Sequence, residues 1–338
     1  MKSNKIKNKK ILIIGGAGFI GHNLAIKLKS LGAIVTILDG LSVNNLNSVK
    51  KNDYKVPFPK LLLKILDQRF KLIKKNKIEL KIIDAREHLK LSKAINDIKP
   101  EIIIHLAAVS HSNISNIYPH LTFDNSLRTL ENALDCSKNK INQFIFLSSS
   151  MVYGNFKKQK VREDDICEPI GIYGALKFSA EKIIKAYGQV FDLPYTIIRP
   201  SALYGERCIS RRVGQIFIES AIKSKKIIIN GDGEDKLDFT YIEDLVEGII
   251  CSIKNKNALH ETFNITYGNS RKVNDMIKIL RNHFPNINIS YKKRDKLMPL
   301  RGTLDISKAK KLLNFHSKWS LDIGYPKYIT WYKDLLKL

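Results

Sequence analysis

Short apolar runs alternate along the chain with longer segments in which apolar residues recur at helical spacing. The uninterrupted apolar runs are typical of strands in a parallel sheet that is buried on both faces. We expect strands over 10–14, 34–38, 79–83, 101–105, 143–147 and 195–198. We expect helices over 21–31, 60–75, 121–139 and 173–191. This alternation predicts an α/β fold, a Rossmann-type doubly wound parallel sheet with ligands at the carboxyl ends of its strands.

The alternation breaks into shorter pieces beyond Arg199-Pro200, which predicts a second, smaller part. We expect a larger domain over 1–200, to which 238–260 returns, and a smaller C-terminal α/β substrate-binding part over 201–237 and 261–338. The region 41–79 contains the break Pro57-Phe58-Pro59 and looks like an insertion between the second and third strands.

A glycine-rich turn, Gly15-Gly16-Ala17-Gly18-Phe19-Ile20-Gly21, follows the first strand and opens the first helix. Gly15 allows the sharp exit from the strand, Gly18 lets the backbone approach a pyrophosphate, and Gly21 lets the helix pack closely. The second strand ends in Asp39, about 20 residues further on, where a carboxylate can accept bonds from an adenosine ribose. The pattern predicts a dinucleotide site, although glycines also cluster in ordinary strand-turn-helix units.

Composition excludes several other classes of protein. The 338 residues are 44% hydrophobic, yet they hold no apolar run of about 20 residues, so we expect neither secretion nor membrane insertion. The four cysteines lie far apart without CxxC spacing, which favours reduced thiols in a cytoplasmic protein without a metal site.

The formal net charge of +26 raises the alternative of a nucleic-acid partner. The lysines are spread over the whole chain rather than gathered in one patch, so we expect no nucleic acid. Such a surface attracts anionic small molecules, sugar nucleotides among them.

Tyr173 and Lys177 lie four residues apart and share one face of a predicted helix. A tyrosine that serves as a base near pH 7 needs its pKa lowered by about 3 units, or about 4 kcal/mol. A neighbouring ammonium and an oxidised nicotinamide ring can supply that stabilisation. The pair alone is also common on helix surfaces, but here it follows a dinucleotide loop and the Ser148-Ser149-Ser150 run.

Together these motifs resemble the extended short-chain dehydrogenase/reductase family, of the sugar-nucleotide epimerase and dehydratase type. The resemblance covers nearly the whole chain. Besides the glycine-rich turn it rests on Asp39, Asp84, His105-Leu106-Ala107-Ala108, Ser148-Ser149-Ser150-Met151-Val152-Tyr153-Gly154, Tyr173 with Lys177, and Arg199-Pro200 ahead of Leu203-Tyr204-Gly205.

The resemblance implies NAD as cofactor, a nucleotide-sugar substrate and a homodimer formed by the helices over 121–139 and 173–191. Tyr173 is then the catalytic acid and base, Lys177 lowers its pKa and holds the nicotinamide ribose, and Ser149 bonds the reacting sugar hydroxyl. Asp39 favours NAD over NADP. The implied cofactor-binding residues are Gly15, Gly18, Phe19, Ile20, Gly21, Asp39, Asp84, Ala85, Leu106, Ala107, Ala108, Tyr173 and Lys177.

Two positions depart from the family pattern: Ala202 stands where the family has Asn, and Leu237 stands where it has Arg. Both lost residues normally hold the nucleotide diphosphate, so the grip must differ or come from other side chains. The candidates for this grip are Arg211, Arg212, Lys236, Arg294 and Arg301.

Other polar residues near the strand ends have two interpretations each. His111 and Ser150 are further candidates for substrate contact, whereas His105 is expected to be a packed strand-end residue. The acidic run Glu163-Asp164-Asp165 is expected to be a solvated loop face.

The leading functional hypothesis is an NAD-dependent epimerase of a nucleotide-linked sugar, most simply a 4-epimerase, in nucleotide-sugar metabolism and polysaccharide biosynthesis. A reductase, dehydrogenase or dehydratase of the same fold is the alternative among enzymes. A dinucleotide-binding regulatory protein is the alternative outside them. Dehydratases of the family carry Asp and Glu where this chain has Ser150 and Met151, which favours epimerisation.

Overall fold

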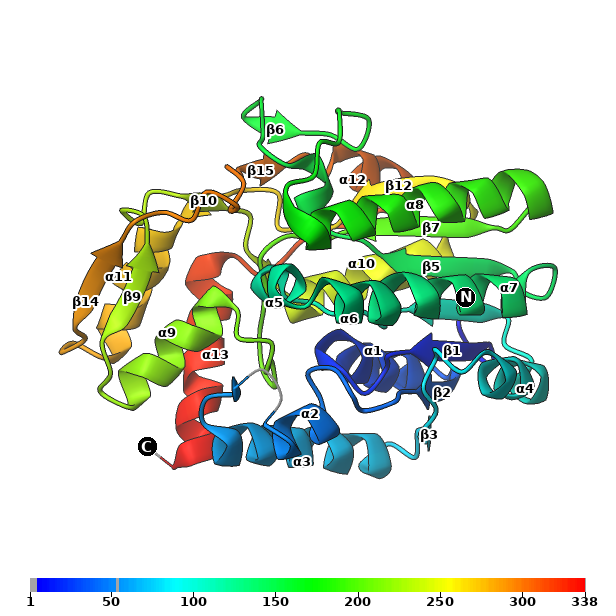
Figure 1. Cartoon of the computed structure of the whole chain (residues 1–338), viewed down its shortest axis with the longest axis horizontal. Coiled ribbons are helices and arrows are strands. Elements are labelled where there is room, and N and C mark those ends of the chain that lie inside the picture. Colours follow the sequence, from blue (N-terminus) through cyan, green and yellow to red (C-terminus); the bar gives the residue numbers. More distant parts are fainter. Residues whose placement is uncertain (1–4, 53–54, 338) are drawn as a thin grey trace.

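A seven-stranded sheet, all parallel, forms the centre of the computed structural model, which describes residues 5–52 and 55–337 (Figure 1). The strand order is β12-β7-β5-β4-β1-β2-β3. The strands are β1 (Lys10–Ile14), β2 (Ile34–Leu38), β3 (Glu79–Lys81), β4 (Ile102–His105), β5 (Gln143–Leu147), β7 (Tyr195–Arg199) and β12 (Glu261–Asn264). The predicted doubly wound fold is therefore confirmed.

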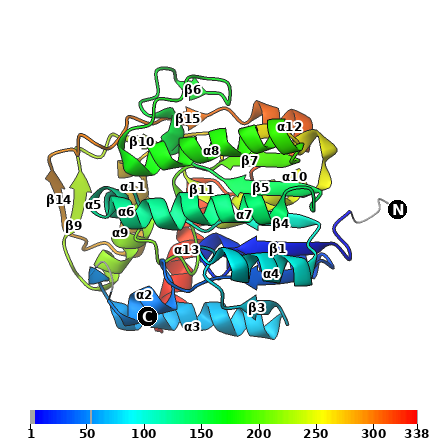
Figure 2. The same cartoon turned by 45° about the vertical axis from the view of Figure 1, so that its right-hand side comes forward.

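Helices cover both faces of this sheet, as the apolar strands require. On one face α4 (His88–Ile98), α7 (Thr129–Ser137) and α8 (Gly171–Phe191) lie across the strands, as Figure 2 shows, and bury residues such as Leu91 and Leu130. On the other face α1 (Phe19–Ser30), α3 (Pro59–Lys75) and α10 (Ile242–Lys254) bury a second apolar core. The central strands β1, β4, β5 and β7 are thus covered on both faces, which explains their lack of polar alternation.

The seventh strand corrects the predicted division of the chain. We expected 261–264 in the smaller part, but β12 pairs in parallel with β7, with Phe263 opposite Ile198. Just before it, α10 packs against α1. The rest of the division into two domains stays a prediction.

The region 41–79 is a crossover between parallel strands rather than an added insertion. It holds the short helix α2 (Leu46–Lys50) and α3, which carries the chain from β2 to β3. Leu62, Ile65 and Leu66 of α3 are fully buried in the core beneath the sheet. A parallel pair of strands needs such a crossover, so α3 is part of the sheet's own architecture.

The helix expected over 121–139 is interrupted by a wider turn. It consists of α6 (Pro119–Phe123), a π-helical segment (Asp124–Arg128) and α7. A π-helical segment holds one extra residue per turn and is frequent at functional sites.

The smaller elements gather beside the carboxyl ends of the central strands, to the left in Figure 1. There β9 (Ile227–Asn230) pairs with β14 (Ile289–Lys292), and β10 (Lys236–Leu237) pairs with β13 (Arg271–Lys272). The helices of this part are α9 (Val213–Ile222), α11 (Val273–His283) and α13 (Leu321–Leu336). The remaining elements are α5 (Ser112–Ile117), β6 (Lys160–Val161), β8 (Leu203–Tyr204), β11 (Thr240–Tyr241), β15 (Thr303–Leu304), α12 (Ser307–Leu313) and two short 3₁₀ turns (Ser150–Tyr153 and Lys256–Ala258).

Within the described ranges, no helix has the length and apolar character needed to cross a membrane.

Candidate active site

A first cavity opens where β1, β2 and β4 end at the glycine-rich turn. It is lined by every cofactor residue that the resemblance implied apart from Tyr173 and Lys177. These residues are Gly15, Gly18, Phe19, Ile20, Gly21, Asp39, Asp84, Ala85, Leu106, Ala107 and Ala108.

The glycines of the turn have different structural roles. Gly15 has φ +77°, and a Cβ there would come within 2.6 Å of the Ala107 nitrogen. A Cβ on Gly21 would lie 2.4 Å from Gly16, so this helix residue packs on the turn itself. A Cβ on Gly18 would meet only the Gly15 oxygen, at 3.2 Å, and Gly18 lines the cavity. The turn therefore has room for a ligand against its backbone.

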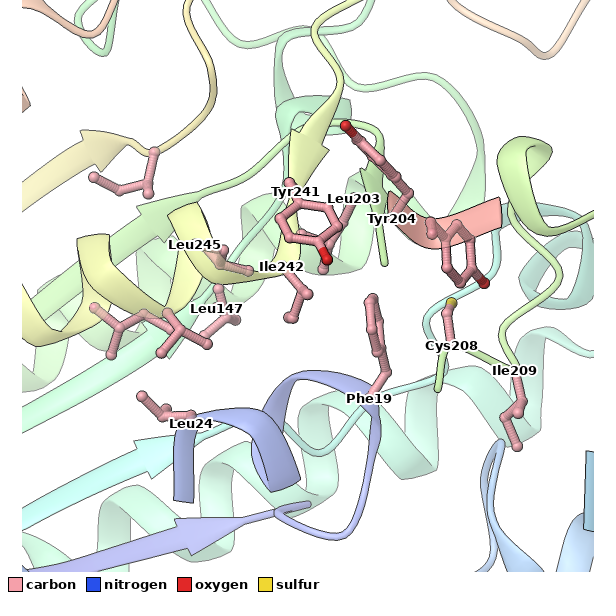
Figure 3. Packing of buried hydrophobic residues seen from close by; sticks show 14 of the residues in the cluster. Phe19, Leu24, Leu147, Leu203, Tyr204, Cys208, Ile209, Tyr241, Ile242 and Leu245 are labelled. Carbon is pink, nitrogen blue, oxygen red and sulfur yellow. The ribbon is translucent and has the colours of Figure 1, made fainter. Parts of the chain in front are cut away.

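Helix α1 begins at this turn without a side-chain cap, because its N-cap residue is Gly18. Uncapped N–H groups and the helix dipole together favour an anion at this point. The Phe19 side chain packs into the core with Tyr241 and Ile242 (Figure 3). Phe19 can therefore serve a pyrophosphate only through its backbone, and the cradle fits the phosphates of a dinucleotide.

Asp39 directly follows β2 and lines this cavity. Its carboxylate accepts the Ala17 N–H at 2.9 Å and the Leu41 N–H at 2.8 Å, which fixes its orientation. Burial raises the pKa of Asp39 to about 6, against the opposing effect of these two bonds. Each carboxylate oxygen can accept more than one bond, so Asp39 keeps acceptor capacity for a ribose hydroxyl.

Asp84, which lines the same cavity, is held by Arg86. The guanidinium donates to both carboxylate oxygens, at 3.1 Å from Nε and 2.6 Å from Nη2, and also pairs with Asp124 at 2.8 Å. Burial acts to raise the pKa of Asp84, but Arg86 outweighs it and the pKa lies below its usual value. Asp84 is therefore an anion whose position Arg86 fixes.

A second, larger cavity of about 320 Å³ adjoins the first. All predicted catalytic and substrate residues line it, namely His111, Ser149, Ser150, Tyr173, Lys177, Arg211, Arg212, Lys236, Arg294 and Arg301. Arg212 lines both cavities, so it lies at their junction.

Ser149 and Tyr173 approach this cavity from two different elements. Ser149 caps the 3₁₀ turn after β5, and its hydroxyl accepts the Met151 N–H at 3.2 Å. Tyr173 lies in the first turn of α8. Burial raises the pKa of Tyr173, and the charge of Arg212 and a bond with the Ser149 hydroxyl act to lower it. The protein thus places two hydroxyl groups together beside a positive charge.

Lys177 is buried one turn after Tyr173. Its ammonium donates to the Leu147 carbonyl at 2.5 Å and lies 4.6 Å from the centre of the Phe146 ring. Burial lowers the pKa of Lys177 to about 7, against the opposing charge of Glu181. In this structure the ammonium is thus directed at the end of β5.

The five basic candidates for the diphosphate grip differ in their partners. Arg211 pairs with Glu219, and Arg294 pairs with Asp235 at 2.9 Å. Neither Arg212 nor Arg301 forms an ion pair within the described residues, and the Nε of each is buried without a hydrogen-bond partner. Lys236 is exposed at the cavity edge.

Arg301 lies within the electrostatic reach of Arg212. Burial, and then the charge of Arg212, lower the pKa of Arg301 to about 10. The two guanidinium groups line one cavity and repel each other, so an anion bound beside them would stabilise both.

The two histidines near the cavity differ in position. His111 lines it with Nδ1 unpartnered, and burial together with Arg212 lowers the pKa of His111 to about 4. His105 is fully buried and stacks on Phe144 with ring centres 6.2 Å apart. His111 is therefore neutral near pH 7, and His105 is a packed strand-end residue as expected.

Sequence reasoning missed several residues at the site. Asn125 and Thr129, from the π-helical segment and the turn after it, line the first cavity. Glu181 lies four residues after Lys177 in α8, and this helical spacing was a signal that could have revealed it. Its carboxylate accepts Arg199 Nε at 2.9 Å and Nη2 at 2.6 Å and also accepts the Ser148 hydroxyl. This buried pair ties α8 to the end of β7.

The interpretation of the acidic run as a solvated face was wrong for Glu163. This carboxylate accepts the Asn264 N–H at 2.8 Å, and its carbonyl accepts Arg199 Nη1 at 3.1 Å. Burial raises the pKa of Glu163. Glu163 is thus part of the support beneath the site.

Comparison with known proteins gives the chain a context. A family model described as the NAD dependent epimerase/dehydratase family matches residues 11–266. An uncharacterized UDP-glucose epimerase of Bacillus subtilis, YtcB, is 30% identical over 343 residues, covering 96% of this chain and 98% of the relative. A putative UDP-glucose 4-epimerase of Methanocaldococcus jannaschii is 30% identical over 333 residues, with the same coverage of both chains.

Among solved structures, the UDP-glucuronic acid 4-epimerase of Bacillus cereus, in complex with UDP-glucuronic acid and NAD, superimposes with a TM-score of 0.85. It is 26% identical, and the match covers 96% of this chain and 99% of that one. The likeness thus extends over the elements that form both cavities.

Proposed function

Because this chain belongs to the NAD-dependent epimerase/dehydratase family, we propose that it is an NAD-dependent epimerase of a nucleotide-linked sugar, of the 4-epimerase type. The observation that carries the proposal is that Ser149, Tyr173 and Lys177 line one cavity, which meets the cavity at the glycine-rich turn at Arg212. A relative named as a putative UDP-glucose 4-epimerase and a similar 4-epimerase structure that contains NAD support the same assignment.

When bound, NAD supplies a site that takes a hydride from the sugar carbon and returns it to the opposite face. The residues of the chain carry out the proton transfer. Tyr173 takes the proton of the sugar hydroxyl as its carbon becomes a ketone, and returns it when the hydroxyl re-forms. Ser149 bonds the same oxygen and holds it beside Tyr173. No net oxidation or reduction results, so the cofactor is not consumed.

Tyr173 needs help to act as a base, because burial raises its pKa. The positive charge of Arg212 and the bond from Ser149 oppose this effect. We assign the remaining lowering to Lys177 and to the positive ring of bound NAD. We further assign binding of the nicotinamide ribose to Lys177. Its ammonium then donates to the ribose hydroxyls and bonds less strongly to the Leu147 carbonyl.

Arg212 and Arg301 are the side chains that we assign to the substrate diphosphate. They have no carboxylate partner among the described residues, whereas Arg211 and Arg294 each have one. Guanidinium groups bind phosphate oxygens through paired donors. This pair would stand in for the lost family residues at Ala202 and Leu237, the second of which is buried in the apolar core.

A reductase or dehydrogenase of the same fold is the second candidate, because the same three residues serve a single hydride transfer. Mass spectrometry of the natively purified protein separates the two. We expect one tightly retained NAD and, when substrate co-purifies, a sugar nucleotide. Protein that retains no cofactor and consumes added NAD or NADH stoichiometrically would instead support the dehydrogenase.

We also propose a cytoplasmic homodimer that acts in nucleotide-sugar metabolism and polysaccharide biosynthesis. Leu130 and Leu134 face the sheet and are fully buried, so they are not available for pairing. Phe123 of α6 and Val190 of α8 are 51% and 69% exposed and are better candidates.

A further inference from the structure

Arg69, in the crossover helix α3, is a fully buried cation without an ion pair in the described part of the chain. Its guanidinium donates to the Arg207 carbonyl, at 2.9 Å from Nε and 2.5 Å from Nη2. It reaches the Ala17 carbonyl at 3.5 Å from Nη1. A buried charge without a carboxylate is costly, so a role beyond packing is expected of it.

Arg69 and Asp39 hold Ala17 of the glycine-rich turn from its two ends. The Ala17 N–H donates to Asp39 at 2.9 Å, while the Ala17 carbonyl faces Arg69. Arg69 makes no ion pair with Asp39 and acts on it through this residue and by its charge. The position of the turn therefore depends on α3 as well as on β1 and β2.

The other partner of Arg69 connects the turn to the substrate side. Arg207 adopts φ +63°, an uncommon conformation for a residue other than glycine, and in it the carbonyl faces Arg69. The Arg207 side chain donates to His22 Nε2 and to the Asn23 side chain, at 3.0 Å each. His22 Nδ1 in turn lies 2.8 Å from the Gly18 carbonyl. These bonds link the glycine-rich turn, α1, α3 and the segment that leads to Arg212.

The charge of Arg69 also acts on the cofactor side. Asp39 accepts ribose hydroxyls most strongly as an anion, and burial raises its pKa to about 6. The bonds from Leu41 and Ala17 and the charge of Arg69 lower this pKa, whereas the charge of Asp84 raises it. A cation beneath the turn further favours an anionic pyrophosphate above it.

We propose that Arg69 is a positioning residue for NAD, which holds the glycine-rich turn and Asp39 in their cofactor-binding arrangement and couples them to the segment that lines the substrate cavity. This inference rests on the proposed NAD-dependent function. It gives the crossover region 41–79 a part in cofactor binding.

The test measures NAD affinity of the full chain between pH 5 and pH 9 for wild type, Arg69→Met, Arg69→Lys and the control Leu62→Ala. Leu62 is fully buried in the same helix, and its truncation removes core contacts but no charge. We expect Arg69→Met to weaken NAD binding about tenfold or more at pH 7, the loss typical of a charged hydrogen bond. NAD affinity should fall as the pH is lowered, and the midpoint of this fall should lie at higher pH in Arg69→Met than in wild type. The variant removes the positive charge of Arg69, which lowers the pKa of Asp39.

Arg69→Lys keeps the charge but not the two-carbonyl geometry. We expect it to keep the wild-type pH midpoint while the KM for the sugar nucleotide rises, because the tie through Arg207 is weakened. Leu62→Ala should lower the melting temperature and leave both the pH midpoint of NAD binding and the KM for the sugar nucleotide unchanged. Wild type that binds no NAD would defeat the proposed function itself.

The inference is overturned when wild type binds NAD and Arg69→Met matches its affinity and midpoint. It is equally overturned when Leu62→Ala shifts the midpoint as far as Arg69→Met does. Should Arg69→Met fail to fold, Arg69→Lys decides the question, and a wild-type NAD affinity together with a wild-type KM in that variant would refute the coupling.

Discussion

The ammonium of Lys177 donates a hydrogen bond of 2.5 Å to the carbonyl of Leu147, two residues before Ser149. Four residues further along α8, Glu181 holds Arg199 at the end of β7. Helix α8 is thus fixed to two neighbouring strand ends just below Tyr173. Side chains placed by regular elements in this way are held more closely than side chains on loops. The relative position of Tyr173 and Ser149 is therefore a property of the sheet itself.

Replacement of Tyr173 tests the proton transfer most directly. We expect Tyr173→Phe to reduce turnover by a factor on the order of 100 or more, because a positioned acid–base group contributes that much. The fold and NAD binding should be unaffected, which circular dichroism and cofactor titration check. Tyr187→Phe, on the same helix but outside both cavities, is the matched control. Near-normal turnover in Tyr173→Phe would remove this residue from the mechanism.

Asp39 is expected to determine the choice of cofactor. Its carboxylate suits a ribose hydroxyl and repels a 2′-phosphate, and the adjoining Gly40 offers no compensating charge. Direct titration should show NAD bound more tightly than NADP. With the pKa of Asp39 near 6, affinity for NAD should fall as the pH drops through that value and the carboxylate takes up a proton. Tighter binding of NADP would contradict the assignment.

We expect Arg212→Gln and Arg301→Gln to have the same effect on KM but different effects on the pH profile of kcat. Both variants should raise the KM of the sugar nucleotide about tenfold or more, since each removes a charged hydrogen bond. Only Arg212→Gln should also move the pH profile of kcat to higher pH, because Arg212 acts to lower the pKa of Tyr173. Exposed Arg281→Gln serves as control for lost surface charge. An unchanged KM in both variants would place the diphosphate elsewhere.

Much of the sheet and of the cavity lining could be predicted from the sequence because their signals are local. Apolar runs mark strands buried on both faces, and the spacing of Tyr173 and Lys177 is contained in one helix. Asp39 follows the glycine-rich turn at the distance that a β-α-β unit requires. These features depend on near neighbours along the chain, so a single sequence contains them.

Other features depend on contacts between distant segments and left no local signal. Arg69 looks like one more cation in a basic helix, and only the fold places it beneath Ala17, 52 residues earlier. Strand β12 is a short mixed segment, Glu261–Asn264, whose role comes from its pairing with β7. The separation of paired from unpaired arginines at the substrate cavity likewise required Glu219 and Asp235 to be placed in space.

The proposed homodimer makes a further prediction about Phe123. This side chain is 51% exposed in α6, beside α8, and an apolar side chain there is suited to a partner surface. We expect light scattering of wild type at micromolar concentration to give the mass of a dimer and Phe123→Glu to shift it toward the monomer. Ile323→Glu, at a similarly exposed apolar residue in α13, should stay dimeric. A monomeric wild type would refute the dimer.

The proposed type of reaction makes a prediction that rests on two positions beside Ser149. Ser150 lines the substrate cavity and Met151 follows it, where dehydratases of the resembled family carry an acid and a base. A thioether cannot exchange a proton and a serine hydroxyl is a poor acid near pH 7, so elimination of water lacks its chemistry here. Hydride transfer at one carbon needs only Tyr173, Ser149 and the cofactor.

We therefore expect sugar nucleotides incubated with the enzyme in deuterated water to change configuration without loss of mass and without deuterium on carbon. A hydride that leaves and returns within the closed site does not exchange with solvent, whereas elimination passes through carbon acids that do. Mass spectrometry of the products distinguishes these outcomes. A product lighter by one water, or one that carries deuterium on carbon, would defeat the epimerase assignment. A net change in the redox state of added cofactor would support the reductase or dehydrogenase instead, because an epimerase returns to its substrate the hydride that it removes and leaves the cofactor unchanged.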